Sequence, residues 1–197
     1  AHDREIGRVA WPEHLEAALR TRGFTEQVRT FMATARSLGL DADDVASLAA
    51  DRDDWRAAAA FMVEYLDVMD SRGLLDYSEL IVRAVAYAES EAGRARLRER
   101  YDLVVVDEYQ DTDPAQERLL QAIAGDGRDL VVVGDPDQSI YAFRGADVRG
   151  ITEFPARFLR ASGDRAPILT LRTSRRCADA VLEASRGVAA VLGPAGS

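Results

Sequence analysis

The sequence predicts an α/β fold in which a parallel sheet follows an all-helical segment. Three short apolar runs, at residues 103–106, 130–133 and 168–171, have the length of single strands. They carry apolar residues on both alternations, as strands do when helices cover both faces of a parallel sheet. Helical patterns lie between the runs, and residues 115–124 give the clearest of them. We therefore expect fully buried strands in an α/β layer architecture.

Residues 1–75 precede the sheet and follow a helical period. Two apolar stripes recur at helical spacing: Val28, Phe31, Met32, Ala35 and Leu38, and then Trp55, Ala58, Met62, Tyr65 and Met69. Thr25 is the expected N-cap of the first helix, and Gly39 and Gly73 are the expected stops. The run at 41–44 predicts the start of a shorter helix. We interpret the stripes as core-facing surfaces of a helical subdomain.

The pattern changes at Asp76, where Asp76-Tyr-Ser-Glu79 resembles a capping box ahead of an apolar helix. The charged stretch 89–100 predicts a solvated helical face and a turn. The predicted domain boundary therefore separates a helical subdomain at 1–75 from an α/β part at 76–197.

Composition narrows the class of protein. A hydrophobic fraction of 47% and a charged fraction of 30% are typical of a globular protein, and no apolar run has the length of a membrane span. Cys177 is the single cysteine, so an internal disulfide is excluded, which fits a reducing cytoplasm. We expect a cytoplasmic protein without a membrane partner.

The basic residues are unusual because all 25 are arginine. A Walker A loop has the motif G-x-x-x-x-G-K-S/T and therefore needs a lysine. A chain without lysine cannot contain one. The net charge of −9 argues against a protein that coats nucleic acid generally, but it leaves room for a local basic or aromatic groove.

Carboxylates follow two of the predicted strands. Asp107 and Glu108 come directly after the first run, and Asp135 follows the second. Such a pair could cap the strand at the surface or hold a metal ion. Because ligands of open α/β sheets bind at the carboxyl ends of strands, we favour a site at which an acidic side chain holds Mg²⁺ on nucleotide phosphates. A second carboxylate beside it could accept a proton from water.

The stretch after Asp135 adds groups that suit nucleotide and nucleic acid. Gln138 carries a neutral amide able to bond a water or a γ-phosphate. Tyr141 and Phe143 next to Arg144 offer ring faces and a cation, which is typical of stacking on single-stranded bases. A core role for Phe143 is the competing interpretation.

Together these blocks resemble a known family. VVVDEYQDTDPAQ followed by VVVGDPDQSIYAFRGAD is similar to motifs II and III of superfamily 1 DNA helicases of the UvrD/Rep/PcrA type. The segment Leu-Asp-Tyr-Ser-Glu-Leu at 75–80 resembles the Asp-Phe-x-Asp-Leu segment that precedes motif II there. The resemblance implies a RecA-like P-loop NTPase motor domain, 1A, for residues 76–197 and a 1B-like helical subdomain for 1–75.

The resemblance also implies roles for residues of motif II. Asp107 and Glu108 would form the Mg²⁺ site of an ATPase, with Glu108 as the general base for water attack on ATP. Gln110 and Asp111 would link the metal site to neighbouring loops.

For motif III, the resemblance implies that Gln138 contacts the γ-phosphate and couples it to the DNA groove. Phe143 would stack on a base, with Tyr141 and Arg144 as further DNA-binding residues. Asp147 belongs to the same motif without an assigned role.

A third block, LTLRTSRRC at 169–177, resembles motif IV, usually Leu-x-x-Asn-Tyr-Arg-Ser. Aligned on Leu171, it places Arg176 on the arginine that contacts the γ-phosphate. Ser174 and Arg175 replace the usual Asn and Tyr, and an ordinary arginine at a helix start is the alternative interpretation.

The chain lacks the Walker A phosphate loop, and this absence defines what to expect of the chain alone. Without a phosphate loop it should bind ATP poorly and hydrolyse it negligibly. Together with the initial Ala, this predicts a central fragment of a longer helicase. Its expected partners are single-stranded DNA, the remaining domains of the parent and, in a helicase-nuclease, a second motor-nuclease subunit.

The resemblance implies 3′-to-5′ movement in DNA repair or recombination. The alternative hypothesis is a non-catalytic module that binds DNA or a partner protein through a helicase-like fold. An unrelated phosphotransferase would leave the motif III block without an explanation.

Overall fold

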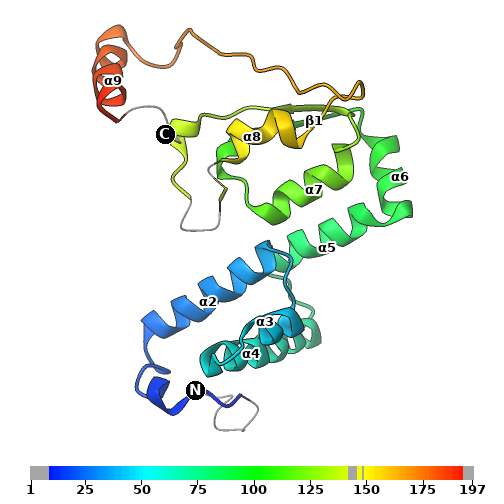
Figure 1. Cartoon of the computed structure of the whole chain (residues 1–197), viewed down its shortest axis with the longest axis vertical. Coiled ribbons are helices and arrows are strands. Elements are labelled where there is room, and N and C mark those ends of the chain that lie inside the picture. Colours follow the sequence, from blue (N-terminus) through cyan, green and yellow to red (C-terminus); the bar gives the residue numbers. More distant parts are fainter. Residues whose placement is uncertain (1–8, 142–145, 148, 193–197) are drawn as a thin grey trace. The chain divides into compact units, whose positions relative to one another are not determined.

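The computed structural model describes residues 9–141, 146–147 and 149–192 of the chain (Figure 1). It contains two compact units: residues 1–94 with 113–119, and residues 95–112 with 120–197. The chain passes between the units three times: within the helix at 91–100, between residues 112 and 113, and within the helix at 114–124. The domain boundary predicted after residue 75 stays a prediction.

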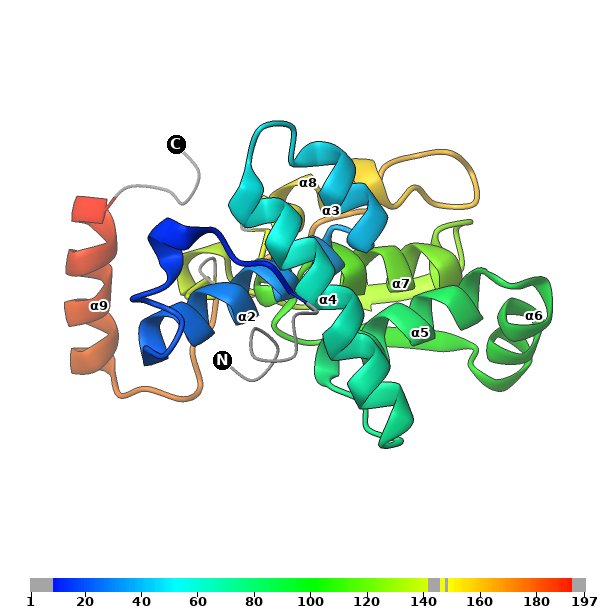
Figure 2. The ribbon, with the colours of Figure 1, turned by 90° about the horizontal axis from the view of Figure 1, so that it is seen from below.

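The first unit is helical, as expected. After the 3-10 turn η1 (Glu13–Leu15) it contains the helices α2 (Arg22–Ser37), α3 (Ala42–Leu48), α4 (Asp53–Ser71) and α5 (Tyr77–Glu89). Figure 2 shows α3 running beside α4, and α2 also contacts α4 and α5. The core joins Ala35, Val45 and Ala59 with Phe31 and Leu40 around them. Of the predicted stripes, Met32, Ala35, Ala58 and Met62 are buried, whereas Leu38 is 58% exposed and does not face the core.

The helix ends follow the capping chemistry of the sequence, with one correction. Gly39 and Gly73 adopt φ angles of 77° and 63° and end their helices as predicted. Asp41 caps α3 in a complete capping box. The N-cap of α2 is Thr21, whose hydroxyl accepts from the amide of Phe24 at 3.2 Å. The prediction of Thr25 was wrong because that residue already lies in the first helical turn.

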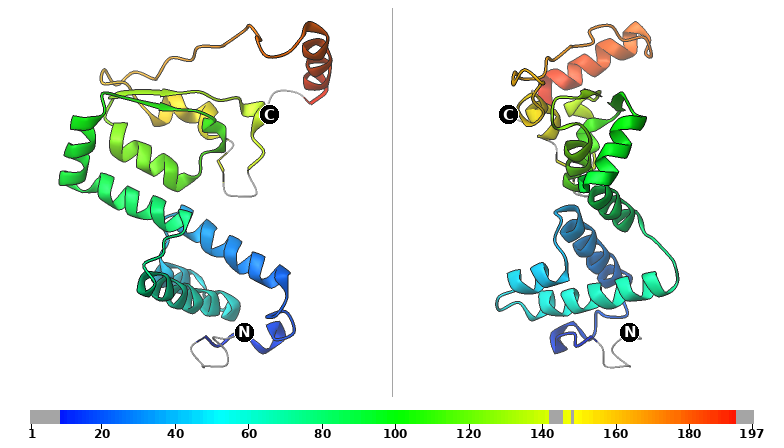
Figure 3. Two further views of the ribbon diagram at one scale, coloured as in Figure 1. Left: turned by 180° about the vertical axis from the view of Figure 1, so that it is seen from behind. Right: turned by 90° about the vertical axis from the view of Figure 1, so that its right-hand side faces the viewer.

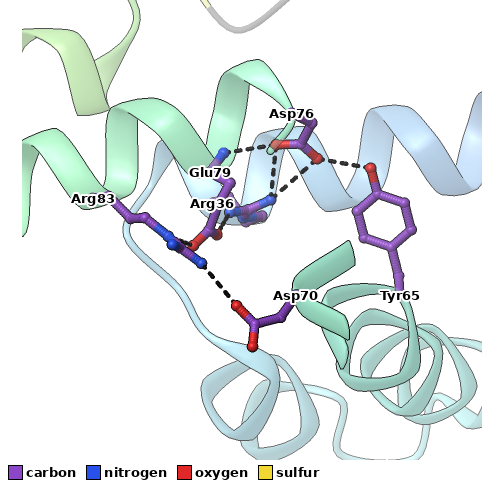
Figure 4. A network of polar contacts seen from close by, with 6 residues as sticks. All are labelled: Arg36, Tyr65, Asp70, Asp76, Glu79 and Arg83. Carbon is purple, nitrogen blue, oxygen red and sulfur yellow. Dashed lines mark hydrogen bonds and ion pairs between the residues drawn. The ribbon is translucent and has the colours of Figure 1, made fainter. Parts of the chain in front are cut away.

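A polar network joins three helices of this unit (Figure 4). Arg36, 4% exposed near the end of α2, donates to the carboxylates of Asp76 and Glu79. Asp76 is the N-cap of α5 and accepts the Glu79 amide at 2.7 Å, and it also accepts the Tyr65 hydroxyl from α4 at 2.9 Å. Burial alone would raise the pKa of Asp76. These hydrogen bonds and the charge of Arg36 outweigh burial, so its pKa lies below the ordinary value.

The second unit contains the sheet and its helices. In chain order, α6 (Glu91–Arg100) leads into β1 (Leu103–Val106), η2 (Tyr109–Asp111), α7 (Pro114–Ala124), β2 (Asp129–Val132), η3 (Pro136–Gln138), α8 (Gly150–Arg157) and α9 (Asp179–Leu192). The first residues of α6 and of α7 belong to the helical unit. Strands β1 and β2 pair in parallel, with Leu103 opposite Asp129 and Val106 opposite Val132. This is the small parallel sheet of an α/β arrangement.

The inner face of the sheet packs on a core of three aromatic rings. Tyr109, Phe154 and Phe158 are buried, and Val106 and Val132 pack against them. The rings of Tyr109 and Phe154 meet edge to face at 5.4 Å, and those of Phe154 and Phe158 stack at 4.9 Å. Figure 3 shows α8, which carries Phe154, beside the strands.

The outer face of the sheet corrects the prediction of fully buried strands. Leu103, Val105, Val131 and Val133 are between 44% and 61% exposed. These side chains are therefore only partly covered by the described residues. The lack of alternation in the sequence therefore reflects two apolar faces, of which the described chain buries one.

The third predicted strand, 168–171, is also wrong. Ile168, Leu169 and Leu171 are at least 73% exposed and lie in coil between α8 and α9 (Figure 1). A strand exists only where a neighbouring strand takes up its backbone hydrogen bonds. In the described part of the chain the sheet has two strands, β1 and β2, and neither pairs with this segment.

Candidate functional site

The carboxylates predicted from the sequence lie at one edge of the sheet. Asp107 and Glu108 directly follow β1, and Asp135 comes three residues after the end of β2. Beyond the strands the two chains stay paired, because the Val133 amide donates to the Val106 carbonyl at 2.8 Å and the Tyr109 amide donates to the Val133 carbonyl at 3.0 Å. Asp107 and Glu108 are both exposed to solvent.

Glu108 has a backbone conformation that is rare for its residue type. Its φ of 53° and ψ of 41° are left-handed helical, which costs an L-residue with a Cβ atom about 1 kcal/mol. The Asp107 carboxylate accepts the Glu108 amide at 3.0 Å. This sharp turn lets Tyr109 enter the core while the preceding carboxylate stays in solvent. Strained residues of this kind cluster at functional sites.

Gln110 connects the two strand ends. It is 1% exposed, and its side-chain amide donates to the Glu108 carboxylate at 2.7 Å while its side-chain oxygen accepts the Asp135 amide at 3.1 Å. Its backbone carbonyl accepts the Ser139 hydroxyl at 3.3 Å. Sequence reasoning expected a linking role here, and the buried position of Gln110 is the part that the sequence did not reveal.

The space for that amide depends on Gly134. A Cβ atom at this position would lie 2.4 Å from the side-chain oxygen of Gln110 and 2.7 Å from the terminal methyl of Ile151. Glycine is therefore required for close approach, since any side chain would displace Gln110.

The turn after β2 is organised by Asp135. Its carboxylate accepts the Asp137 amide at 3.0 Å and the side-chain amide of Gln138 at 2.7 Å. Gln138 is exposed, so its amide lies at the surface of the same strand-end edge as Glu108. The two residues are joined indirectly through Asp135 and Gln110.

The predicted DNA-binding residues are described only in part. Tyr141 is half-buried, and its carbonyl accepts the Ala146 amide at 3.3 Å. Phe143 and Arg144 lie outside the described residues. Asp147 donates its amide to the Thr112 carbonyl at 3.1 Å, which brings the end of this stretch to the residue that follows η2.

The structure does not bring Arg176 into this group. It lies in an exposed bend ahead of α9, outside the hydrogen bonds that connect Glu108, Gln110 and Asp135. Asp111 does lie at the strand-end edge, and its Oδ1 atom is buried without a hydrogen-bond partner among the described residues.

The donor set at the strand ends suits a hard cation. Asp107 and Glu108 present carboxylate oxygens to solvent, which Mg²⁺ prefers. Within the described ranges no three His, Cys, Asp or Glu side chains come close enough to form a protein-only metal cage. Mg²⁺ is usually bound by one or two carboxylates together with substrate phosphates and water, so the residues fit that mode of binding.

Comparison with known proteins places these features in a family. The UvrD/REP helicase N-terminal domain matches residues 5–159. The chain is 38% identical to ATP-dependent DNA helicase UvrD2 of Mycobacterium tuberculosis, over 90% of this chain and 27% of that protein. It is 43% identical to ATP-dependent DNA helicase UvrD1 of the same organism, over 56% of this chain and 15% of that protein.

A further relative is the RecBCD enzyme subunit RecB of Mycolicibacterium smegmatis, 37% identical over 59% of this chain and 10% of that protein. The chain spans about a quarter of the length of UvrD2 and less of the other two. No helix in the described ranges is both long and apolar enough to cross a membrane. On the match over most of its length, the chain belongs to the UvrD/REP helicase N-terminal domain family.

Proposed function

We propose that this chain forms part of the ATPase core of an ATP-dependent DNA helicase that acts on single-stranded DNA. The observation that carries the proposal is the exposed Asp107–Glu108 pair at the end of β1, tied through Gln110 to the turn that holds Gln138. The relatives UvrD2 and UvrD1 are named ATP-dependent DNA helicases, which supports the same class of reaction.

In this proposal Asp107 and Glu108 hold Mg²⁺ with the phosphates of ATP. The cation neutralises charge on the phosphate oxygens. Glu108 accepts the proton of the attacking water. The hydrogen bond from Gln110 fixes the direction of the Glu108 carboxylate, so that its other lone pairs face solvent and the water.

Gln138 is proposed to contact the γ-phosphate. Its amide is held by Asp135, and that carboxylate would be exchanged for phosphate oxygen when nucleotide binds. Because the Asp135 amide is bonded to Gln110, a change at Gln138 would reach the residue that orients Glu108. Arg176 is proposed to reach the same phosphate, and Tyr141, Phe143 and Arg144 to contact the DNA.

The rest of a parent protein would complete the site. The 197 residues contain no lysine, so a phosphate loop must come from elsewhere, and this chain alone should not turn over ATP. The half-exposed sheet face of Leu103, Val105, Val131 and Val133 is proposed to pack against further elements of a RecA-like domain 1A, with the helical part corresponding to 1B.

We further propose 3′-to-5′ movement in DNA repair or recombination. The likeness to a RecBCD enzyme subunit supports a second motor-nuclease subunit as partner. Strand displacement from duplexes with a single 3′ or 5′ tail would decide the polarity, since only the 3′-tailed duplex should be opened by the parent.

The main test replaces Glu108 with Gln in the parent protein. Turnover of ATP, with and without oligo-dT, should fall at least a hundredfold because a general base contributes about 10²–10⁴ in rate, while ATP affinity stays within about twofold because Mg²⁺ and the phosphates keep their other contacts. Glu99→Gln, an exposed carboxylate of α6, is the matched control and should leave both unchanged.

The outcomes separate the two hypotheses. Turnover retained in Glu108→Gln would contradict the general-base role. Oligo-dT binding by the parent with no ATP turnover in the unaltered protein would favour the non-catalytic module instead.

A further inference from the structure

The stretch 139–147 is attached at both ends to the turn that follows the Asp107–Glu108 pair. At its start, the Ser139 hydroxyl donates to the Gln110 carbonyl at 3.3 Å. At its end, the Asp147 amide donates to the Thr112 carbonyl at 3.1 Å. The first attachment is a single hydrogen bond of a hydroxyl. The second is part of a larger arrangement around Asp147.

Asp147 is engaged at every polar group. Its carboxylate accepts from the guanidinium of Arg157 at 2.7 Å and from the Arg149 amide at 3.1 Å, and its carbonyl accepts the Gly150 amide at 2.8 Å. Burial would raise the pKa of Asp147. The hydrogen bond from Arg157 and the nearby positive charge prevail, and the pKa lies below its ordinary value. Asp147 is therefore charged at neutral pH, and both its carboxylate and its backbone groups are hydrogen-bonded.

Arg157 is held as firmly as the group it binds. It is the last residue of α8, and its guanidinium also pairs with Glu153 one turn earlier at 2.5 Å. Its backbone carbonyl accepts the side-chain amide of Gln121 from α7 at 2.9 Å. The residues on either side of this turn, Phe154 and Phe158, are the rings that pack on the core. Arg157 thus links the end of the stretch to the aromatic core of the unit.

The charge of Arg157 is neutralised within the protein. Two carboxylates, Asp147 and Glu153, lie within 2.7 Å of one guanidinium nitrogen. An arginine that binds a nucleic-acid phosphate needs its donors facing solvent. Arg157 is only about a quarter exposed, so its place in the structure favours holding the chain over touching a ligand.

We propose that Asp147 and Arg157 are positioning residues that fix the outgoing end of the stretch 139–147 to Thr112. The pair thereby joins the segment carrying Tyr141 to the turn that orients Glu108. The consequence for single-stranded DNA rests on the proposed function; the attachment itself does not. With the pair broken, the hydrogen bonds of Asp147 to Thr112 and Gly150 weaken, and the affinity of the chain for single-stranded DNA falls.

The test uses the full chain with Arg157→Met, which keeps the aliphatic stem, and Asp147→Asn, which removes the carboxylate charge and leaves the backbone amide in place. The matched control is Arg186→Met, which removes the same charge from an exposed position of α9. Exchange of the Asp147 and Gly150 amides, followed by NMR, reports the attachment. Arg157→Met and Asp147→Asn should each speed amide exchange about fivefold. The double variant should exchange little faster than either single variant, because the two residues act as a pair.

Binding of a fluorescein-labelled oligo-dT reports the consequence. Arg157→Met should weaken the affinity about fivefold and Arg186→Met less than about twofold. A direct phosphate contact would lower the slope of log affinity against log salt by about 0.7 for a single strand. A positioning residue leaves that slope unchanged, and Arg157→Lys should restore part of the affinity.

The exchange measurement decides the attachment, and the binding measurement decides its consequence for DNA. Unchanged exchange of the Asp147 amide in Arg157→Met overturns the attachment. Faster exchange with unaltered oligo-dT affinity overturns its consequence for DNA. If the unaltered chain binds no oligo-dT, the DNA part of the proposed function fails for this chain, and the exchange data alone still decide whether Asp147 and Arg157 hold the segment.

Discussion

The substitution Gln110→Met isolates the residue that connects the two strand ends. Methionine has nearly the same length and no branch, so it fills the buried slot while removing both side-chain hydrogen bonds. The amide of Asp135 then loses its acceptor, and the Glu108 carboxylate loses a donor at 2.7 Å. The change should loosen the carboxyl ends of β1 and β2 and leave the helical unit intact.

The magnitude follows from the two bonds. A hydrogen bond to a charged group contributes about 2 kcal/mol, and leaving the partly buried Asp135 amide unpaired costs about 1 kcal/mol. Burial of the less polar methionine side chain returns somewhat less than about 1 kcal/mol. The net loss is about 2 kcal/mol, which corresponds to roughly thirtyfold faster opening.

The assay is amide exchange at Tyr109 and Val133, whose amides donate across the strand ends. An internal control comes from Trp11 and Trp55, which both belong to the helical unit, so urea unfolding followed by tryptophan fluorescence should not change. Gln138→Met, at an exposed position, should cost about 0.5 kcal/mol. If Gln110→Met speeds exchange no more than Gln138→Met does, Gln110 does not hold the strand ends together.

Three more outcomes follow from the same structure. Gly134→Ala should destabilise the sheet unit by about 1–3 kcal/mol because the added methyl overlaps the Gln110 amide; exchange as slow as in the unaltered chain would contradict this. Arg36→Met should lower the free energy of unfolding of the helical unit by about 3 kcal/mol, because two carboxylates lose their cation. Tyr65→Phe, which removes one hydrogen bond, should lower it by about 1 kcal/mol. Tryptophan fluorescence follows the unfolding in both cases. The folded-state pKa of Asp76 lies below its ordinary 3.8, so the charged carboxylate stabilises the helical unit fully above pH 3.8, and this stabilisation is lost as the pH falls through the folded-state pKa. The free energy of unfolding, measured between pH 6 and pH 2, should show this loss. Asp76→Asn should reduce the slope of that free energy against pH.

Local signals in the sequence predicted the local features of the fold. The run 103–106 became β1, the run 130–133 overlaps β2, and the carboxylates lie at the carboxyl ends of these strands. Asp76 accepts the Glu79 amide, which is the N-cap half of the predicted capping box. These features depend on residues within a few positions of one another. The same is true of the glycines that end α2 and α4.

Features that depend on distant partners were not predictable. The run 168–171 has the composition of a strand but no strand beside it in the described chain. The exposure of Val105 and Val131 could not be read from residues that are apolar on both faces. The buried position of Gln110 and the pairing of Asp147 with Arg157 join residues 10 to 25 positions apart, and no periodicity marks them.

The left-handed backbone of Glu108 is unfavourable for folding, whereas the proposed general-base role requires glutamate at this position. Glycine would relieve a conformational cost of about 1 kcal/mol, and asparagine or aspartate would tolerate the same angles. All three lack a carboxylate on a two-carbon stem. A library of all substitutions at this position, selected once for folded yield and once for activity of the parent, should therefore rank these residues in opposite orders, as is characteristic of a stability–activity trade-off.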